Sequence, residues 1–330
     1  MSDDGASPWT AAIAAVTGSV MVGLMPLLAR HLYAAGIDPA SMLLWRYLLA
    51  LAPLTLAIAV LRLDVGAAWR GGAWQIVAIG ATLGAAQTLC FWESIKTLDT
   101  SIAVLLFYTY PALTLALERV VLGRPVRLRA AACVAAILCG AALVTVPGLR
   151  GGAIDPRGLA WAIPAPLIYA VYLVLTASLL RRHPPLIGAV CLYSGMAVVF
   201  GAGAAFNGLD WPADRTSWLL LLFIALGPGA LMITLFSYSA PRLGPSSYAI
   251  IANVELVTVV TIGVTVLGEK VTPSRAIGGG LIISGILAHG VFGARGAAPD
   301  RVAALRFPPP QPGKGPGEGG AATPPSAAGS

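Results

Sequence analysis

The sequence predicts an all-α integral membrane protein with ten transmembrane helices, arranged as two inverted five-helix repeats. Composition, the length of the apolar runs and a match of the chain to itself lead to this prediction. The chain has 330 residues, of which 57% are hydrophobic and only 11% are charged, and its mean hydropathy is +0.82. Soluble domains carry about 25% charged residues, so the composition excludes an ordinary soluble enzyme and a disordered chain.

The apolar residues form runs of the length that a bilayer requires. A spanning helix needs about 20 mostly apolar residues. Short gaps that contain Gly, Pro and charged residues separate the runs, as turns between helices would. The ten expected helices are 9–29, 41–61, 72–95, 101–122, 130–147, 158–180, 186–206, 217–240, 246–267 and 276–292.

The chain also matches itself at an offset of 145 residues, without a gap from the third expected helix to the fifth. The matched pairs include Phe91 with Phe236, Ser94 with Ser239, Leu98 with Leu243, Ser101 with Ser246, and Gly140 with Gly285. Each half would hold five helices, and because five is odd the second half would enter the membrane inverted. Inverted repeats are typical of secondary transporters. The expected organisation is a first repeat at 9–147, a second at 158–293, and a disordered Pro/Gly-rich cytoplasmic tail at 294–330.

The distribution of basic residues predicts the orientation. If the N-terminus is cytoplasmic, 13 Lys and Arg residues fall on the cytoplasmic side and 7 on the other side. Basic loops prefer the cytoplasm, so we expect both termini there, in a multi-pass bacterial inner (plasma) membrane protein. The net charge of +7 does not indicate nucleic-acid binding, because the basic residues are scattered over short loops between apolar runs.

Three segments carry a family resemblance. The first is Phe107-Tyr108-Thr109-Tyr110-Pro111, followed by Val121-Leu122-Gly123; the second is Val254-Glu255-Leu256, followed by Leu267-Gly268-Glu269-Lys270-Val271-Thr272-Pro273; the third is Ile277-Gly278 with Gly285-Ile286. In this order they resemble the fourth, ninth and tenth helices of the drug/metabolite transporter superfamily, in proteins with two EamA domains. The resemblance covers residues 9–293 and implies ten helices, alternating access, and transport of small organic metabolites.

The chain departs from the family pattern at two places. The Gly-Glu that usually closes the first repeat reads Gly123-Arg124 here, and the frequent Glu-Pro of the ninth helix reads Glu255-Leu256. The second change removes the proline that would kink the ninth helix.

Polar side chains at membrane depth indicate a site, because they are costly in lipid and normally face the protein interior or a wet cavity. Glu255 lies about 15 Å into its helix at about 1.5 Å per residue. It is a candidate for proton coupling or for contact with a cation, and a hydrogen bond to a neighbouring helix is the alternative. Tyr110 is its repeat partner, and Tyr108 is the partner of Asn253. Residues two apart on a continuous helix point about 200° apart, so we expect Tyr110 and Glu255 to line the cavity in preference to Tyr108 and Asn253.

Further candidates for substrate binding or coupling lie on other helices. Gln87 lies within the third helix and needs a polar partner. Glu93 precedes Lys96 by three residues, so an ion pair between them is an alternative to substrate contact. Arg46 lies near the outer end of the second helix, where snorkelling to headgroups or binding of an anion would account for it. The remaining candidates are Tyr238, which is the repeat partner of Glu93, and Tyr169, which could stack on a substrate.

The expected function is a secondary active transporter, preferably an exporter, of small organic metabolites such as amino acids. The alternatives are a channel and a non-catalytic membrane scaffold. The chain contains only three His and no Cys/His spacing typical of zinc, so we expect no catalytic residue, no metal and no cofactor. The expected partners are a small-molecule solute, the lipid bilayer and a coupling proton or cation, without nucleic acid. The protein would act as a monomer or homodimer.

The glycines predict close helix packing. Gly80 and Gly84 form a GxxxG pair, and Gly278, Gly279, Gly280 and Gly285 lie along the last helix. Small residues let helices approach closely, so these positions are expected to form packing seams, with a dimer surface as the alternative.

Overall fold

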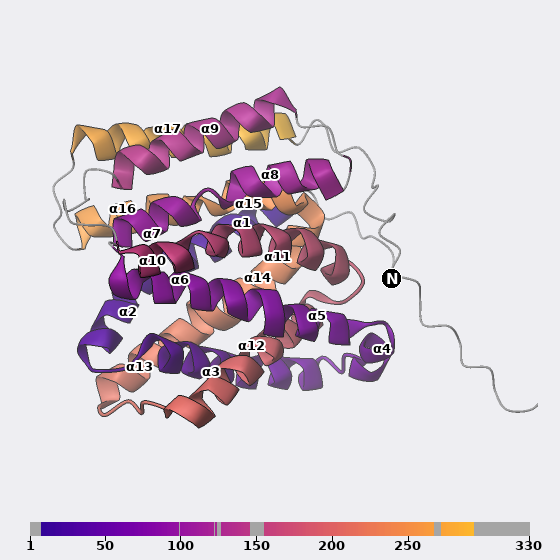
Figure 1. The fold of residues 1–330 in the computed structure, drawn as a ribbon. Helices are drawn as coiled ribbons and strands as arrows, with labels where there is room; N and C mark the ends of the chain where they lie inside the picture. The colour runs from indigo at the N-terminus through magenta and orange to yellow at the C-terminus, as the bar shows by residue number, and fades with distance from the viewer. Residues whose placement is uncertain are drawn as a thin grey trace, which may run out of the picture. The chain divides into compact units, whose positions relative to one another are not determined.

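A computed structural model describes residues 8–98, 100–121, 123, 127–145, 155–266 and 272–293, all of which belong to one compact unit, Met1–Ala298 (Figure 1). Every regular element in this part of the chain is helical. The elements are α1 (Pro8–Gly23), α2 (Met25–Ala34), α3 (Pro39–Val60), α4 (Val65–Arg70), α5 (Ala73–Ile79), η1 (Gly80–Gly84), α6 (Ala85–Thr97), α7 (Thr100–Phe107), α8 (Tyr110–Val121), α9 (Leu128–Thr145), α10 (Pro156–Ala162), α11 (Pro164–Leu180), α12 (Pro185–Asn207), α13 (Arg215–Ile224), η3 (Ala225–Leu231), α14 (Met232–Leu243), α15 (Pro245–Ala252), α16 (Val254–Thr265) and α17 (Pro273–Gly293). The predicted tail at 294–330 lies outside the described residues, as do Arg124 and the segment 267–271.

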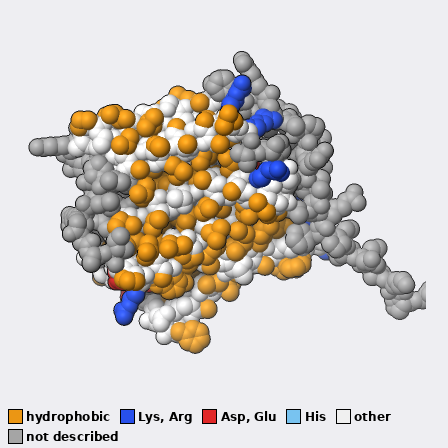
Figure 2. Space-filling model, turned by 45° about the horizontal axis from the view of Figure 1, so that its top comes forward, with side chains coloured by type: hydrophobic (Ala, Val, Ile, Leu, Met, Phe, Trp, Pro, Cys, Tyr) orange, Lys and Arg blue, Asp and Glu red, His pale blue; other side chains and the backbone are white. Residues whose placement is uncertain are grey.

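The helices have the length and polarity of membrane spans. Within the described ranges, seven helices are long and apolar enough to cross a bilayer, namely Pro39–Val60, Ala73–Thr97, Ile102–Val121, Pro156–Leu180, Pro185–Asn207, Arg215–Leu243 and Pro245–Ile262. Three shorter apolar helices accompany them, namely Trp9–Gly23, Leu128–Val144 and Ala276–His289. Figure 2 shows one face on which hydrophobic side chains cover the middle, while the Lys and Arg side chains in view lie toward its edges. The prediction of an all-helical membrane protein is thereby confirmed.

Aspartates mark the starts of four helices. Asp38, Asp64, Asp155 and Asp214 immediately precede α3, α4, α10 and α13, and the side chain of each accepts a hydrogen bond from a backbone N–H of the first turn. Such N-caps satisfy donors that the helix itself leaves free. They place the ends of these helices at the polar gaps between the apolar runs.

Three expected transmembrane helices are interrupted just before a proline. The breaks fall at Leu24, at Tyr108 and Thr109, and at Ile163. Each is followed within a few residues by Pro26, Pro111 or Pro164 in the first turn of the next helix. Proline has no backbone N–H to continue a helical ladder, and it is well tolerated in a first turn.

The expected ninth helix breaks as well, although Leu256 stands where the family has proline. The break falls at Asn253, between α15 and α16. The Asn253 side chain donates from Nδ2 to the Ala249 carbonyl at 2.7 Å, while its backbone N–H turns to the Ile250 carbonyl at 3.3 Å. An asparagine side chain that takes the i−4 carbonyl competes with the helical ladder, and it replaces the proline as the cause of the break.

The irregular segments of the two halves share the 145-residue offset. The break at Tyr108 corresponds to the break at Asn253. The π-helical segment η1 starts at Gly80, and its counterpart η3 starts at Ala225. Short π-helical segments occur frequently at functional sites, and both of these lie beside the cavity described below.

Glycines bring helices into backbone contact, as the sequence predicted. A Cβ atom added to Gly80 would lie 2.4 Å from the Leu192 carbonyl oxygen of α12. One added to Gly140 of α9 would lie 2.6 Å from the Gly278 carbonyl oxygen of α17, and the reverse distance is also 2.6 Å. Figure 1 shows α9 and α17 side by side. The predicted packing seams are therefore present at Gly80, Gly84, Gly278 and Gly285, whereas a Cβ atom added to Gly279 or Gly280 would meet nothing within 4 Å.

Candidate functional site

A cavity of about 1190 Å³ lies among helices from both halves of the chain. Its lining runs from Ser19 on α1 to Val259 on α16. Asp38 and Lys96, whose side chains are 47% and 41% exposed, line the same cavity as the buried Tyr110, so the cavity connects the surface to the protein interior.

Aromatic rings form much of the inner wall of the cavity. The Tyr110 and Tyr169 ring centroids lie 4.8 Å apart, and those of Tyr169 and Tyr172 lie 5.9 Å apart with the rings stacked. Tyr172 in turn stacks on Phe236 of α14 at 5.9 Å. The Tyr110 hydroxyl donates to the Ala249 carbonyl at 3.2 Å, which connects α8 to α15 across the two halves. This wall offers flat apolar faces to a solute.

Tyr108 lines the cavity together with Tyr110, contrary to the prediction that only one of the pair would face it. That prediction assumed one continuous helix. The break at Tyr108 and Thr109 separates α7 from α8, so the geometry of an unbroken helix does not apply. The repeat partners of this pair in the other half are Asn253 and Glu255. Glu255 lines the cavity, whereas Asn253 is fully buried and lies outside the lining.

The Glu255 carboxyl group is the acidic group placed among these rings. It interacts electrostatically with the Tyr108 hydroxyl and with the Arg46 guanidinium. Gln87 also lines the cavity and donates to the Gly84 carbonyl at 3.2 Å and to the Thr88 hydroxyl at 2.6 Å.

One of the two predictions for Arg46 was that its side chain snorkels to the membrane surface. The structure contradicts this prediction. The Arg46 side chain is only 7% exposed and lines the cavity. It donates to the Pro228 carbonyl of η3 at 2.7 Å and to the Tyr193 hydroxyl of α12 at 3.1 Å. A π-helical segment disturbs the usual hydrogen-bond ladder, and Arg46 satisfies one of its carbonyl groups.

Two other predicted site residues lie outside the lining of the cavity. Glu93 pairs with Lys96, with 2.6 Å between Oε1 and Nζ, which is the ion pair anticipated as the alternative. The Tyr238 hydroxyl lies 3.2 Å from the Thr10 hydroxyl, and its ring packs under the Arg242 guanidinium at 4.0 Å.

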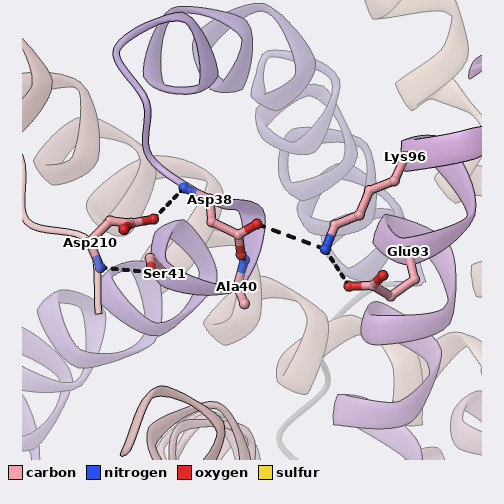
Figure 3. A network of polar contacts seen from close by, with 6 residues as sticks. All are labelled: Asp38, Ala40, Ser41, Glu93, Lys96 and Asp210. Carbon is pink, nitrogen blue, oxygen red and sulfur yellow. Dashed lines mark hydrogen bonds and ion pairs between the residues drawn. The ribbon is translucent and has the colours of Figure 1, made fainter. Parts of the chain in front are cut away.

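A polar network surrounds the surface end of the cavity (Figure 3). Lys96 Nζ lies 3.8 Å from Asp38 Oδ1 and contacts Glu93 as well. The Asp38 backbone N–H donates to Asp210 at 2.8 Å, and the Asp210 backbone N–H donates to the Ser41 hydroxyl at 3.0 Å. The network therefore connects the segment after α2, the end of α6, and the segment between α12 and α13.

Two further contacts connect the far ends of the cavity-lining helices, one between the two halves and one within the second half. The Ser246 hydroxyl at the start of α15 donates to the buried Glu118 carboxylate of α8. Arg181, just after α11, donates from Nε to the Pro241 carbonyl of α14 at 2.7 Å. Glu118 is not among the site residues predicted from the sequence. The available signal was an acidic residue eight positions after Tyr110 in the same apolar run, about 12 Å along the helix.

The arrangement suits binding of a solute better than chemistry on it. Among the described residues, no group of three or more His, Cys, Asp or Glu side chains could hold a metal ion. The cavity instead combines an aromatic wall with the buried Arg46 and the Glu255 carboxyl group, and Asp38 and Lys96 line its surface end. A bundle of membrane-spanning helices around such a cavity defines the class of membrane transport proteins.

Comparisons with known proteins identify the family. The model of the EamA-like transporter family matches residues 9–146 and again 156–289. The chain therefore belongs to the EamA-like transporter family, and it is a membrane transporter rather than an enzyme. An uncharacterized transporter of Archaeoglobus fulgidus is 25% identical over 194 residues, which are 59% of this chain and 68% of that protein. A crystal structure described only as that of a protein superposes with a TM-score of 0.73 over 87% of this chain and 98% of its own. Its sequence identity is 17%, so it supports the fold alone.

Proposed function

We propose that the protein is a secondary active transporter that exports small organic metabolites, such as amino acids or related solutes, across a bacterial inner membrane. The observation that carries the proposal is the cavity, because it brings polar groups and aromatic faces from both halves of the chain to one place inside a membrane bundle. A volume of about 1190 Å³ exceeds that of a single small metabolite and falls slightly above the usual range for ligand pockets, about 300–1,000 Å³.

The two halves act as inverted repeats in this proposal, with boundaries at 9–147 and 158–293. Paired helix breaks at Tyr108 and Asn253, and paired π-helical segments at Gly80 and Ala225, support a common ancestral unit. Ten helices divided into two sets of five would give the halves opposite orientations. Broken helices of this kind surround the central sites of transporters built from inverted repeats.

Alternating access follows from the asymmetry between the two ends of the cavity. Asp38 and Lys96 leave one end connected to the surface. At the far end, contacts such as the one between Glu118 and Ser246 hold the two halves together. With both termini in the cytoplasm, the connected end faces outward. Rocking of the halves would break the inner contacts and close the outer end.

Glu255 is the proposed coupling group. A carboxyl group at membrane depth can exchange a proton when the cavity opens to each side in turn. Among the residues that the structure describes, the other charged groups that line the cavity are Arg46, Lys96 and Asp38. Glu255→Gln, which keeps the shape of the side chain and removes its proton exchange, should abolish the pH dependence of transport while the protein still folds.

A metabolite comparison tests the proposal. A bacterial host expresses the wild-type chain, Glu255→Gln, an empty vector, or the control Asp64→Asn, which makes the same chemical change at an exposed helix cap where asparagine also serves. We expect one class of solute to accumulate in the medium with the wild type and the control, and not with Glu255→Gln. Selective depletion of a solute from the medium would contradict export and indicate uptake. Equal profiles from well-inserted wild type and empty vector would contradict the transport proposal.

A further inference from the structure

We infer that Arg46 forms a binding site for the carboxylate group of an organic solute, whose body packs on the aromatic wall of the cavity. This inference rests on the proposed function and specifies the chemistry of its substrate. Its basis is a buried cation that lines a cavity open to the surface and has no carboxylate of the described residues within 4.0 Å.

The hydrogen bonds of Arg46 leave part of its binding capacity unused. A guanidinium group has five N–H donors. Two of the contacts of Arg46 are to neutral oxygens, the Pro228 carbonyl and the Tyr193 hydroxyl, and a third is to the Met25 sulfur at 3.4 Å, which is a weak acceptor. The buried Nε has no acceptor at all within the part of the chain that the structure describes.

The charge of Arg46 is also unbalanced. No carboxylate of the described ranges lies within 4.0 Å of its nitrogens, although Glu255 lies close enough to interact with it electrostatically across the cavity. Burial of an unpaired charge is costly, and a partner that brings the opposite charge recovers much of that cost. A solute that enters from the surface can supply this charge.

The geometry around Arg46 favours a planar anion. The guanidinium carbon lies 5.8 Å from the ring centroids of both Tyr47 and Tyr193, so the two rings hold the group in a defined position. Arginine binds carboxylates through two parallel hydrogen bonds, which lysine cannot reproduce. The wall formed by Tyr110, Tyr169 and Tyr172 then offers flat apolar surfaces to the rest of the solute.

Four radiolabelled probes test the inference by equilibrium dialysis against the purified full-length protein. Three share a phenylethyl body: 3-phenylpropionate carries a carboxylate alone, phenylalanine a carboxylate and an ammonium, and phenethylamine an ammonium alone. The fourth probe is inorganic phosphate. We expect one or both carboxylate probes to bind at least about tenfold more tightly than phenethylamine and phosphate, because a hydrogen bond to a charged group is lost without the carboxylate. Preference between the two carboxylate probes distinguishes a simple acid from a zwitterion.

Variants at Arg46 complete the test. Arg46→Gln should weaken binding of the carboxylate probe at least about tenfold, and Arg46→Lys should weaken its binding less. The control Arg70→Gln, at the exposed end of α4, should bind the probe like the wild type. The probe series on the wild type remains decisive if Arg46→Gln does not fold. Phenethylamine or phosphate that binds as tightly as the carboxylates, no binding by any probe, or equal binding by a folded Arg46→Gln would overturn the inference. Binding needs no translocation, so carboxylate binding without any transport would refute the proposed function and leave this site standing.

Discussion

Substitution of Gly195 by alanine should destabilise the fold by a calculable amount. A Cβ atom at this position of α12 would lie 2.1 Å from the Val77 carbonyl oxygen and 2.6 Å from the Ala81 nitrogen. Carbon–oxygen contacts are normally about 3.3–3.6 Å, so α12 would have to move by about 1 Å from α5 and η1. Overpacking costs about 1–3 kcal/mol, and the gain from replacing a helical glycine offsets about 1 kcal/mol of this. The clashing atoms belong to the backbone and cannot move aside as a flexible side chain would, so we expect the upper end of the remaining range, a net loss of about 2 kcal/mol.

Thermal unfolding of the detergent-purified protein, followed by tryptophan fluorescence, measures this effect. Gly203→Ala on the same helix is the matched control, since an added Cβ there would meet nothing within 4 Å. A loss of about 2 kcal/mol lowers the Tm by about 4–8 °C in a chain of about 150–250 residues and by less in a longer chain such as this one. Gly203→Ala should leave the Tm unchanged or raise it. A Gly195→Ala protein as stable as Gly203→Ala would refute the close packing of α12 against α5 and η1.

Three further predictions concern polar contacts. Hydrogen bonds from the Ser217 backbone and hydroxyl hold the pKa of Asp214 below its ordinary value of 3.8, so the carboxylate stabilises the folded state at neutral pH. The Tm deficit of Asp214→Ala should therefore be full at pH 7 and shrink as the pH falls below 3.8 through the lowered pKa. A double-mutant cycle with Glu118→Ala and Ser246→Ala should give a coupling free energy of about 0.5–3 kcal/mol in thermal unfolding, and additive effects would exclude this contact. Lys96→Gln should cost less than about 1 kcal/mol, because its ion pairs are largely exposed, and added salt should reduce the difference from wild type.

The sequence predicts the helices of this fold well, because the apolar runs and the capping aspartates are local signals. The helix break at Asn253 could not be predicted from the family pattern, since it depends on a side chain that takes the Ala249 carbonyl in place of the backbone N–H. A proline in the sequence indicates such a break, as Pro111 does. Asparagine within an apolar run does not, because its side chain can equally hydrogen-bond to a neighbouring helix and leave its own helix continuous.

The candidate site was only partly predictable for a different reason. The depth of Glu255 and Tyr110 in their helices follows from counting residues, and both line the cavity. The burial of Arg46 depends on η3, α12 and α2, which contribute its partners from distant parts of the sequence. The contact of Glu118 with Ser246 likewise joins residues 128 apart in the chain. Pairings of this kind arise from tertiary packing and leave no local pattern.

Counterflow in proteoliposomes tests the central claim most directly, which is that one cavity serves both sides of the membrane in turn. Vesicles containing the purified chain are loaded with the solute identified by the metabolite comparison, and entry of the labelled solute is followed from outside. Alternating access predicts saturable entry that transiently exceeds equilibrium and depends on the internal solute. Entry that rises linearly with concentration and never exceeds equilibrium would contradict the account and indicate a channel.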